Sequence, residues 1–263
     1  MIKKAFIAPT SLIQKYGNKG DFHLMLSHLI AEDPEHINAY EHEIRNSKLP
    51  IILDNGLFEN GKAEDMDSLI RKAIAVGATH VFAPDVLFDR AATEANIGIM
   101  AEKLEGTGVK MAGVVQANNV YDFLASYSWM VGNEAIDLIG LSILAVPESF
   151  KEVTKSDDIT INRIACLQAL RDLPAHKNTH LLGAGSAYID ILYAEKNCPW
   201  VVSHDSSSAI WNGLHGKRIG PKTLDVEGGK INLPVDFEWA GLITEEAHQT
   251  IEANIQVVNH LCN

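Results

Sequence analysis

The amino-acid sequence predicts an α/β fold, and a TIM-like (β/α)8 barrel in particular. Short apolar runs rich in β-branched residues alternate seven times with amphipathic stretches, one run about every thirty residues. The runs are apolar on both faces, which is typical of a parallel sheet covered by helices. A chain of 263 residues, 46% of them hydrophobic, suits one large barrel. No linker or repeat divides it, so residues 1–263 are expected to form a single domain.

The expected elements follow the chain in order. Buried strands are predicted over Ala5–Ala8, Ile51–Asp54, His80–Ala83, Met111–Gln116, Leu138–Leu144, His180–Gly183 and Trp200–Ser203. Helices are predicted between them over Ala63–Val76, Asp89–Leu104, Val120–Met130, Thr160–Leu173 and Tyr188–Glu195. The first of these helices has acidic residues in its first turn and ends at a glycine, as dipole and C-cap chemistry favour.

Three segments are less regular. Asp21–Ile30 and Pro34–Asn46 are predicted as helices inserted before the second strand, and Thr244–Leu261 as a long final helix with a cap and an acidic first turn. The eighth strand is expected either near Lys217–Gly220 or within Leu224–Leu233, where a Glu-Gly-Gly sequence is typical of a hairpin turn.

Composition excludes several classes of protein. No window approaches the roughly 18 uninterrupted apolar residues of a membrane span, so no membrane association is expected. The apolar run within Met1–Pro9 is too short for a signal peptide. Cys166, Cys198 and Cys262 are odd in number and scattered, which indicates a reducing compartment and a cytoplasmic location. The 22 basic and 34 acidic residues give a net charge of −12, so a polyanion could bind only through a local basic patch.

Polar side chains follow several predicted strands at their carboxyl ends, where barrel enzymes hold their active sites. Asp54, Asp85 and Asp205 supply carboxylates there, and Gln116 supplies an amide. A single aspartate at such a position often only caps the next helix. Three caps are less expected, because glycines follow Asp54 and a serine run follows Asp205. Converging carboxylates suit glycosyl transfer or the binding of a hard cation.

The glycines of Gly183-Ala184-Gly185-Ser186 admit two interpretations. Because the segment precedes a predicted helix, its backbone amides could cradle a phosphate. A tight turn from strand to helix explains the same glycines more simply.

Six short motifs occur in a fixed order along the chain. They are Asp54-Asn55-Gly56-Leu57-Phe58-Glu59, Phe82-Ala83-Pro84-Asp85, Gly113-Val114-Val115-Gln116, Ile139-Gly140-Leu141-Ser142, His180-Leu181-Leu182-Gly183-Ala184-Gly185 and Ser203-His204-Asp205-Ser206-Ser207, with Asn212-Gly213 downstream. In this order they resemble the tRNA-guanine transglycosylase superfamily, whose members exchange guanine for a 7-deazaguanine in nucleic acid. Each motif is weak alone, and together they span roughly the central two-thirds of the chain.

The resemblance implies a role for each matched residue. Asp205 would be the nucleophile that attacks the ribosyl C1′ and displaces guanine, and Asp54 the general base for the incoming base. The remaining matched residues would bind the purine: Asp85 and Gln116 at its hydrogen-bonding edge, Gly140 and Leu141 through backbone groups, Phe58 by stacking, and Asn55 and Gly56 beside them. A carboxylate and an amide suit the donors and acceptors of guanine. Phe58 could instead be a core residue, and Tyr188 could stack in its place.

The chain also departs from the family pattern. Zinc-containing members carry a Cys-x-Cys-x2-Cys cluster, which the three cysteines here do not match, so we expect no zinc, no other cofactor and no dimer built on a zinc subdomain. The compact chain resembles the phage-type branch that places 7-deazaguanines, such as 7-cyano-7-deazaguanine, into DNA in the host cytoplasm. The expected partners are therefore DNA and the free base, and Lys217 and Arg218 in Trp211–Arg218 are the expected phosphate contacts.

Alternatives remain open at this point. The same exchange could act on tRNA, or the chain could bind a 7-deazapurine without turnover. A phosphosugar-handling barrel is a further alternative, although no strand-end lysine offers Schiff-base chemistry. His180 and His204 are predicted to be structural, and no triad order supports a serine hydrolase.

Overall fold

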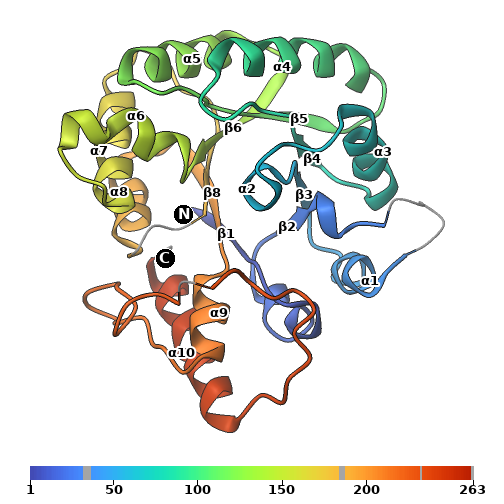
Figure 1. Cartoon of the computed structure of the whole chain (residues 1–263), viewed down its shortest axis with the longest axis vertical. Helices are drawn as coiled ribbons and strands as arrows, with labels where there is room; N and C mark the ends of the chain where they lie inside the picture. The colour runs from blue at the N-terminus through green and yellow to red at the C-terminus, as the bar shows by residue number, and fades with distance from the viewer. Residues whose placement is uncertain (32–36, 184–186, 232, 262–263) are drawn as a thin grey trace.

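Eight parallel strands form a nearly closed barrel in the computed structural model, which describes residues 1–31, 37–183, 187–231 and 233–261 (Figure 1). The strands of this described part are β1 (Lys3–Phe6), β2 (His23–Leu26), β3 (Ile51–Asp54), β4 (His80–Phe82), β5 (Lys110–Val114), β6 (Ile136–Ser142), β7 (Thr179–Leu182) and β8 (Val201–Ser206). Their spatial order is β1-β8-β7-β6-β5-β4-β3-β2. The predicted TIM-like barrel is confirmed.

Asp21, just before β2, is hydrogen-bonded to Lys4 in β1, so the two ends of this strand order are connected. The backbone amide of Asp21 donates to the carbonyl of Lys4 at 2.7 Å, and the amide of Lys4 donates to Asp21 Oδ2 at 2.9 Å. The chain approaches β1 so closely that a Cβ on Gly20 would lie 2.8 Å from the Lys4 carbonyl oxygen. A glycine is therefore required at this position.

The prediction of a helix over Asp21–Ile30 is wrong. His23–Leu26 forms β2, which pairs in parallel with β3, and a short 3-10 turn follows over Ser27–Leu29. All four residues of β2 are buried, because the strand lies between the barrel interior and the outer layer. The eighth strand is therefore β2 and not a segment near the C-terminus.

The two C-terminal candidates for the eighth strand instead meet at an isolated antiparallel bridge between Ile219 and Val226. The chain reverses between Gly220 and Asp225, before the residues predicted as the hairpin turn; Glu227-Gly228-Gly229 instead form a separate tight turn after the bridge, in which Gly228 and Gly229 have positive φ. In the N-terminal insertion, helix α1 (Ala39–Asn46) confirms the second predicted helix from Ala39 onward. Its N-terminus is a capping box between Asn38 and Glu41. Residues 34–36 of that prediction lie outside the described residues.

Helices follow the strands and pack around the barrel. Those that match the predicted helices are α3 (Met66–Val76), α4 (Arg90–Leu104), α5 (Val120–Gly132), α7 (Ile159–Arg171), α8 (Ile189–Asn197) and α10 (Glu245–Leu261). Three others were not expected: α2 (Leu57–Asn60), α6 (Ala145–Thr154) and α9 (Ser208–Leu214). Helix α3 begins after Asp65, whose side chain accepts from the amides of Asp67 and Ser68, and it ends at the left-handed Gly77.

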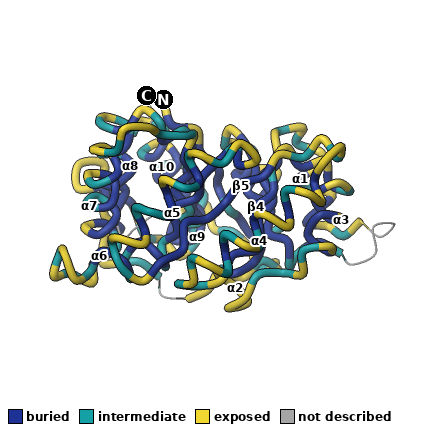
Figure 2. Tube along the Cα trace, turned by 90° about the horizontal axis from the view of Figure 1, so that it is seen from above, coloured by how far each residue is buried: buried dark blue, intermediate teal, exposed yellow. Residues whose placement is uncertain are grey.

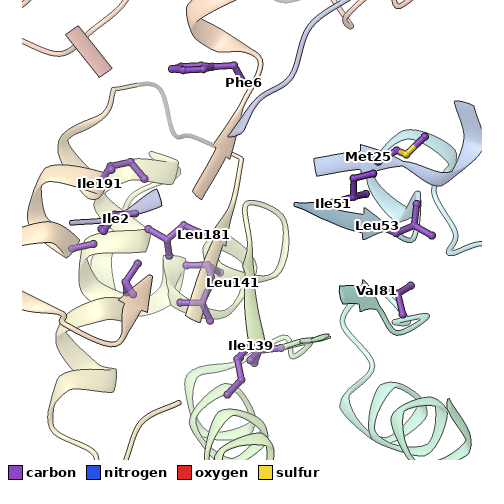
Figure 3. Close-up of a cluster of buried hydrophobic side chains, with 14 of the residues drawn as sticks. Ile2, Phe6, Met25, Ile51, Leu53, Val81, Ile139, Leu141, Leu181 and Ile191 are labelled. Atoms are coloured by element: carbon purple, nitrogen blue, oxygen red, sulfur yellow. The ribbon is translucent and has the colours of Figure 1, made fainter. Parts of the chain in front are cut away.

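The hydrophobic core has two layers. The inner layer fills the barrel with Ala5, Phe22, Leu24, Ile52, Phe82, Ala112, Val114 and Leu138. The outer layer lies between strands and helices, and Figure 3 shows part of it, including Ile51, Leu53 and Val81. Figure 2 shows that buried residues follow the strands and inner helix faces, whereas exposed residues lie outside. No helix of the described residues is long and apolar enough to cross a membrane.

Candidate active site at the carboxyl ends of the strands

A cavity of about 470 Å³ opens at the carboxyl ends of the strands, within the size range of small-molecule sites. Its inner wall is apolar and formed by Ile7, Leu24, Leu26, Val114 and Leu182. Its polar lining includes Asp54 from β3 and Asp205 from β8. The structure therefore brings together the two aspartates that the sequence places 151 positions apart.

Asp205 is buried, and two donors hold one of its oxygens. Oδ1 accepts from His180 Nε2 at 3.0 Å and from the backbone amide of Gly183 at 3.0 Å. His180 also contacts the Ser203 hydroxyl through Nδ1 at 2.8 Å, which fits an imidazole protonated on Nε2. No hydrogen bond from the described residues reaches Asp205 Oδ2. That oxygen is available to a molecule in the cavity.

Asp54 has a different environment. It is half-buried at the end of β3, and its Oδ2 accepts from the amide of Gly56 at 2.9 Å. Burial raises the pKa of Asp54 to about 8, and the nearby charges of Glu59, Asp205 and Asp85 contribute to the rise. Asp54 is therefore largely protonated at neutral pH, and it can give up a proton to a bound molecule.

Glu59 is a further acidic group in this cavity, and no role for it was predicted from the sequence. It projects from the short helix α2 into the lining. Burial raises the pKa of Glu59, and the charge of Asp205 raises it further. Its position in the same motif as Asp54 was the one signal that could have pointed to it.

Asp85 lines the cavity and is held by two amides. Its Oδ1 accepts from Asn55 Nδ2 at 2.6 Å, and its Oδ2 accepts from Gln116 Nε2. Burial raises the pKa of Asp85 to about 6, and the two amides counteract that rise. Gln116 is fully buried behind Asp85, and its Oε1 accepts from the amide of Phe88 at 3.0 Å. Gln116 therefore orients Asp85, which corrects the expectation that it reaches a purine itself.

The two aromatic residues considered for stacking on a base, Phe58 and Tyr188, differ in their exposure. Phe58 lines the cavity and is 58% exposed, so it stands at the mouth and not in the core. Tyr188 is 1% exposed and packs in the outer core, which removes it as a stacking residue. Asn55 lines the cavity, whereas Gly56 contributes only its backbone amide to Asp54.

Two predicted substrate contacts do not reach the cavity. Gly140 lies within β6, where its carbonyl accepts from Val115 and a Cβ would lie 2.8 Å from Phe82 Cε1. Leu141 is fully buried in the outer core. The next three residues, Ser142–Leu144, line the cavity in their place.

The predicted phosphate contacts also lie outside the cavity lining. Lys217 Nζ donates to the carbonyls of Gly228 and Gly229 at 3.0 and 2.7 Å, so it stabilises the turn. The carbonyl of Arg218 accepts from the amide of Glu227 in the same hairpin. Lys230 is the one cation among the described lining residues, and burial lowers its pKa to about 8.

A segment after α9 covers one side of the cavity. Helix α9 anchors this segment, whose lining residues are Ile231, Leu233, Pro234, Val235 and Phe237. Asn212 Oδ1 accepts from the amide of Ile231 at 2.9 Å, and Trp211 Nε1 donates to the carbonyl of Leu233 at 3.1 Å. Nothing in the sequence pattern indicated that this segment folds back over the strands.

The remaining candidates have limited roles. Gly183 lines the cavity with φ of 67°, as a tight turn requires, and the rest of the proposed phosphate cradle (184–186) lies outside the described residues.

Cys166 and Cys198 are free and buried, and Cys262 lies outside the described residues. Within the described ranges, no three side chains come together as metal ligands. Burial lowers the pKa of His204 to about 4, so it is a neutral core residue.

Comparisons with known proteins give only distant structural likenesses. No family model and no curated protein matches this chain. A variant of the citrate synthase SbnG is 15% identical, with a TM-score of 0.48 over 78% of this chain and 86% of that chain. RipC from Yersinia pestis is 10% identical, with a TM-score of 0.43 over 78% and 89% of the chains. An enolase from Pseudomonas fluorescens with bound magnesium, potassium and tartrate is 12% identical, with a TM-score of 0.43 over 95% of this chain and 55% of that one. These likenesses indicate no particular function.

The raised pKa of Asp54 predicts a pH-dependent stability change. A buried carboxyl whose pKa rises from about 4 in the unfolded chain to about 8 destabilises the folded protein increasingly between those values. Asp54→Asn removes this cost, so the variant should equal the wild type near pH 4. It should be more stable near pH 8 by up to about 5 kcal/mol, the free energy of a pKa change from about 4 to about 8.

Urea unfolding at several pH values between 4 and 9 measures this difference. The matched control is Asp157→Asn, which changes an exposed aspartate. A difference between Asp54→Asn and the wild type that stays constant with pH would contradict the assignment of a raised pKa to Asp54.

Proposed function

We propose that the protein is a base-exchanging pentosyltransferase that replaces guanine in DNA with a 7-deazaguanine through a covalent aspartyl-glycosyl intermediate. One observation carries the proposal: Asp54 and Asp205 line one cavity in contrasting environments. Two donors favour the carboxylate of Asp205, whereas burial favours the protonated form of Asp54. This division between an ionised and a protonated carboxyl suits a double displacement at a sugar carbon.

In the first half of the proposed reaction, Asp205 Oδ2 bonds to C1′ of the target nucleotide. The bond between C1′ and guanine N9 breaks, and its electron pair stays with the base. Asp54 donates its proton to the departing base, for which a pKa of about 8 is suitable at neutral pH. The products are free guanine, an Asp54 carboxylate and a glycosyl ester on Asp205.

In the second half, the ring nitrogen of the incoming 7-deazaguanine loses its proton to the Asp54 carboxylate. That nitrogen bonds to C1′, the ester bond to Asp205 breaks, and Asp205 regains its carboxylate. Two inversions at C1′ preserve the anomeric configuration. Asp54 thus acts first as an acid and then as a base, and the site returns to its starting protonation state.

Base recognition is proposed to depend on Asp85. A carboxylate accepts hydrogen bonds from the N1–H and 2-amino groups that guanine and 7-deazaguanines share. Asn55 and Gln116 fix both oxygens of Asp85, so the acceptor direction is set before a base binds. Phe58, exposed at the mouth, supplies a surface on which an extruded base can stack.

The choice of DNA over tRNA rests on the resemblance of the compact chain to the phage-type branch. With a net charge of −12 and Lys217 engaged in its own turn, the protein is expected to bind DNA with modest and strongly salt-dependent affinity.

Incubation with radiolabelled guanine and duplex DNA, single-stranded DNA or tRNA tests the proposal. We expect label to enter DNA, because exchange of guanine for guanine uses the same two half-reactions. Incorporation into tRNA alone would reject the DNA assignment. No incorporation anywhere, together with tight binding of 7-cyano-7-deazaguanine, would identify a non-catalytic binding protein.

A further inference from the structure

Arg163 is a fully buried cation that the proposed reaction does not yet use. It lies on α7, on the helical side of the sheet, and its guanidinium donates to the carbonyls of Leu182 and Gly183 at 2.6 and 2.5 Å. It also donates to the carbonyl of Leu141 at 3.4 Å and to Asp190 Oδ2 at 3.2 Å. Arg163 therefore ties the carboxyl ends of β6 and β7 to the first turn of α8.

One peptide unit connects Arg163 with Asp205. The carbonyl of Leu182 accepts from Arg163, and the amide of the same unit, that of Gly183, donates to Asp205 Oδ1. In a trans peptide the C=O and N–H bonds point in opposite directions, so this unit lies between the guanidinium and the carboxylate. A cation on the carbonyl polarises the unit and strengthens its amide as a donor.

We propose that Arg163 is a positioning residue for Asp205 and acts through the Leu182–Gly183 peptide. The inference rests on the proposed role of Asp205 as the nucleophile. By fixing this peptide, Arg163 keeps the Gly183 amide on Oδ1 and leaves Oδ2 to face the cavity. The attacking oxygen is thus selected before the substrate binds.

The shape of the guanidinium explains why arginine occupies this position. Its planar fork serves the adjacent Leu182 and Gly183 carbonyls while it also pairs with Asp190, whereas a lysine ammonium is a point charge. Gly183 adopts φ of 67°, which directs its carbonyl to Arg163 and its amide to Asp205. Stability alone gives little reason for the arrangement, because a buried ion pair is often no more stabilising than apolar packing.

Arg163→Lys tests the inference against Lys177→Met as a matched control. Lys177 also donates to two backbone carbonyls, those of Met130 and Asn133, but it lies just before β7 at the opposite end of the barrel. The first readout is the NMR resonance of the Gly183 amide proton, which needs no activity. We expect it to shift upfield in Arg163→Lys as the hydrogen bond to Asp205 weakens, and to stay in place in Lys177→Met.

The second readout is single-turnover guanine release. Arg163→Lys should lower the rate constant about 100-fold, while the affinity for the free base, measured by calorimetry, stays unchanged.

The outcomes separate the two proposals. An unmoved Gly183 resonance in Arg163→Lys would overturn the positioning role whatever the activity. A wild-type protein that exchanges no base would refute the proposed function, while the Gly183 resonance would still decide the role of Arg163. If Arg163→Lys does not fold, Arg163→Gln takes its place. In Arg163→Ala, added guanidinium should restore guanine release, and failure to do so in the folded variant would count against the inference.

Discussion

We expect Asp205→Asn to abolish base exchange, with a loss of at least about 10⁴-fold. The amide keeps the size of the carboxyl and can still accept from Gly183, but it cannot form the ester to C1′. Binding of the free base should stay within about threefold of the wild type, because Asp85 and Phe58 carry recognition. Label incorporation into DNA measures exchange, and calorimetry with 7-cyano-7-deazaguanine measures binding.

The control for this variant is again Asp157→Asn, which should exchange base at the wild-type rate because it lies on an exposed loop. Substantial exchange by Asp205→Asn would remove Asp205 from the mechanism. Loss of both exchange and free-base binding would indicate that Asp205 binds the base and would require another nucleophile.

Asp54→Asn is expected to lower guanine release by about 10²- to 10⁴-fold, the range of general acid catalysis. The wild-type rate of release should also fall as the pH rises through about 8, because Asp54 then loses the proton that it gives to the leaving base. Single-turnover release from DNA between pH 5 and 10 shows both effects. In Asp54→Asn the alkaline limb should vanish; if it persisted, another group would be the acid.

The barrel could be predicted from sequence because its strands are buried on both faces, which leaves an uninterrupted apolar run for each. Strand β2 escaped prediction for a physical reason. Its residues include Leu24, Met25 and Leu26, which favour a helix locally, and only pairing with β3 on the barrel wall makes them a strand. The short helices α2 and α9 escaped because they occupy loop segments without a recurring apolar period.

The carboxylates of the site were predictable in the same way, since carboxyl ends of parallel strands meet at one rim. The hydrogen-bond partners of these carboxylates were not predictable from the sequence. His180 reaches Asp205 from the neighbouring strand β7, whose register with β8 shifts between Thr179 and His180. Gln116 turns toward Asp85 and Phe88, and Arg163 enters from a helix behind the sheet. Such contacts depend on side-chain packing between distant segments, which no periodicity of the sequence encodes.

The environments of the three aspartates could not be predicted from the sequence either. Asp54 and Asp205 lie at the carboxyl ends of β3 and β8, and Asp85 lies just beyond β4, yet burial and neighbours give the three carboxyls different environments. Asp54 has Glu59 beside it and a single backbone donor, whereas Asp205 has two donors on one oxygen. This difference gives the pair its proposed division between acid and nucleophile.

Mass spectrometry of the denatured protein after reaction with guanine-containing DNA in the absence of a replacement base tests the central claim most directly. We expect a deoxyribosyl adduct on the peptide that contains Asp205. The adduct should be absent in Asp205→Asn, and free 7-cyano-7-deazaguanine added before denaturation should remove it. Release of guanine without an adduct, or an adduct on another residue, would contradict this claim.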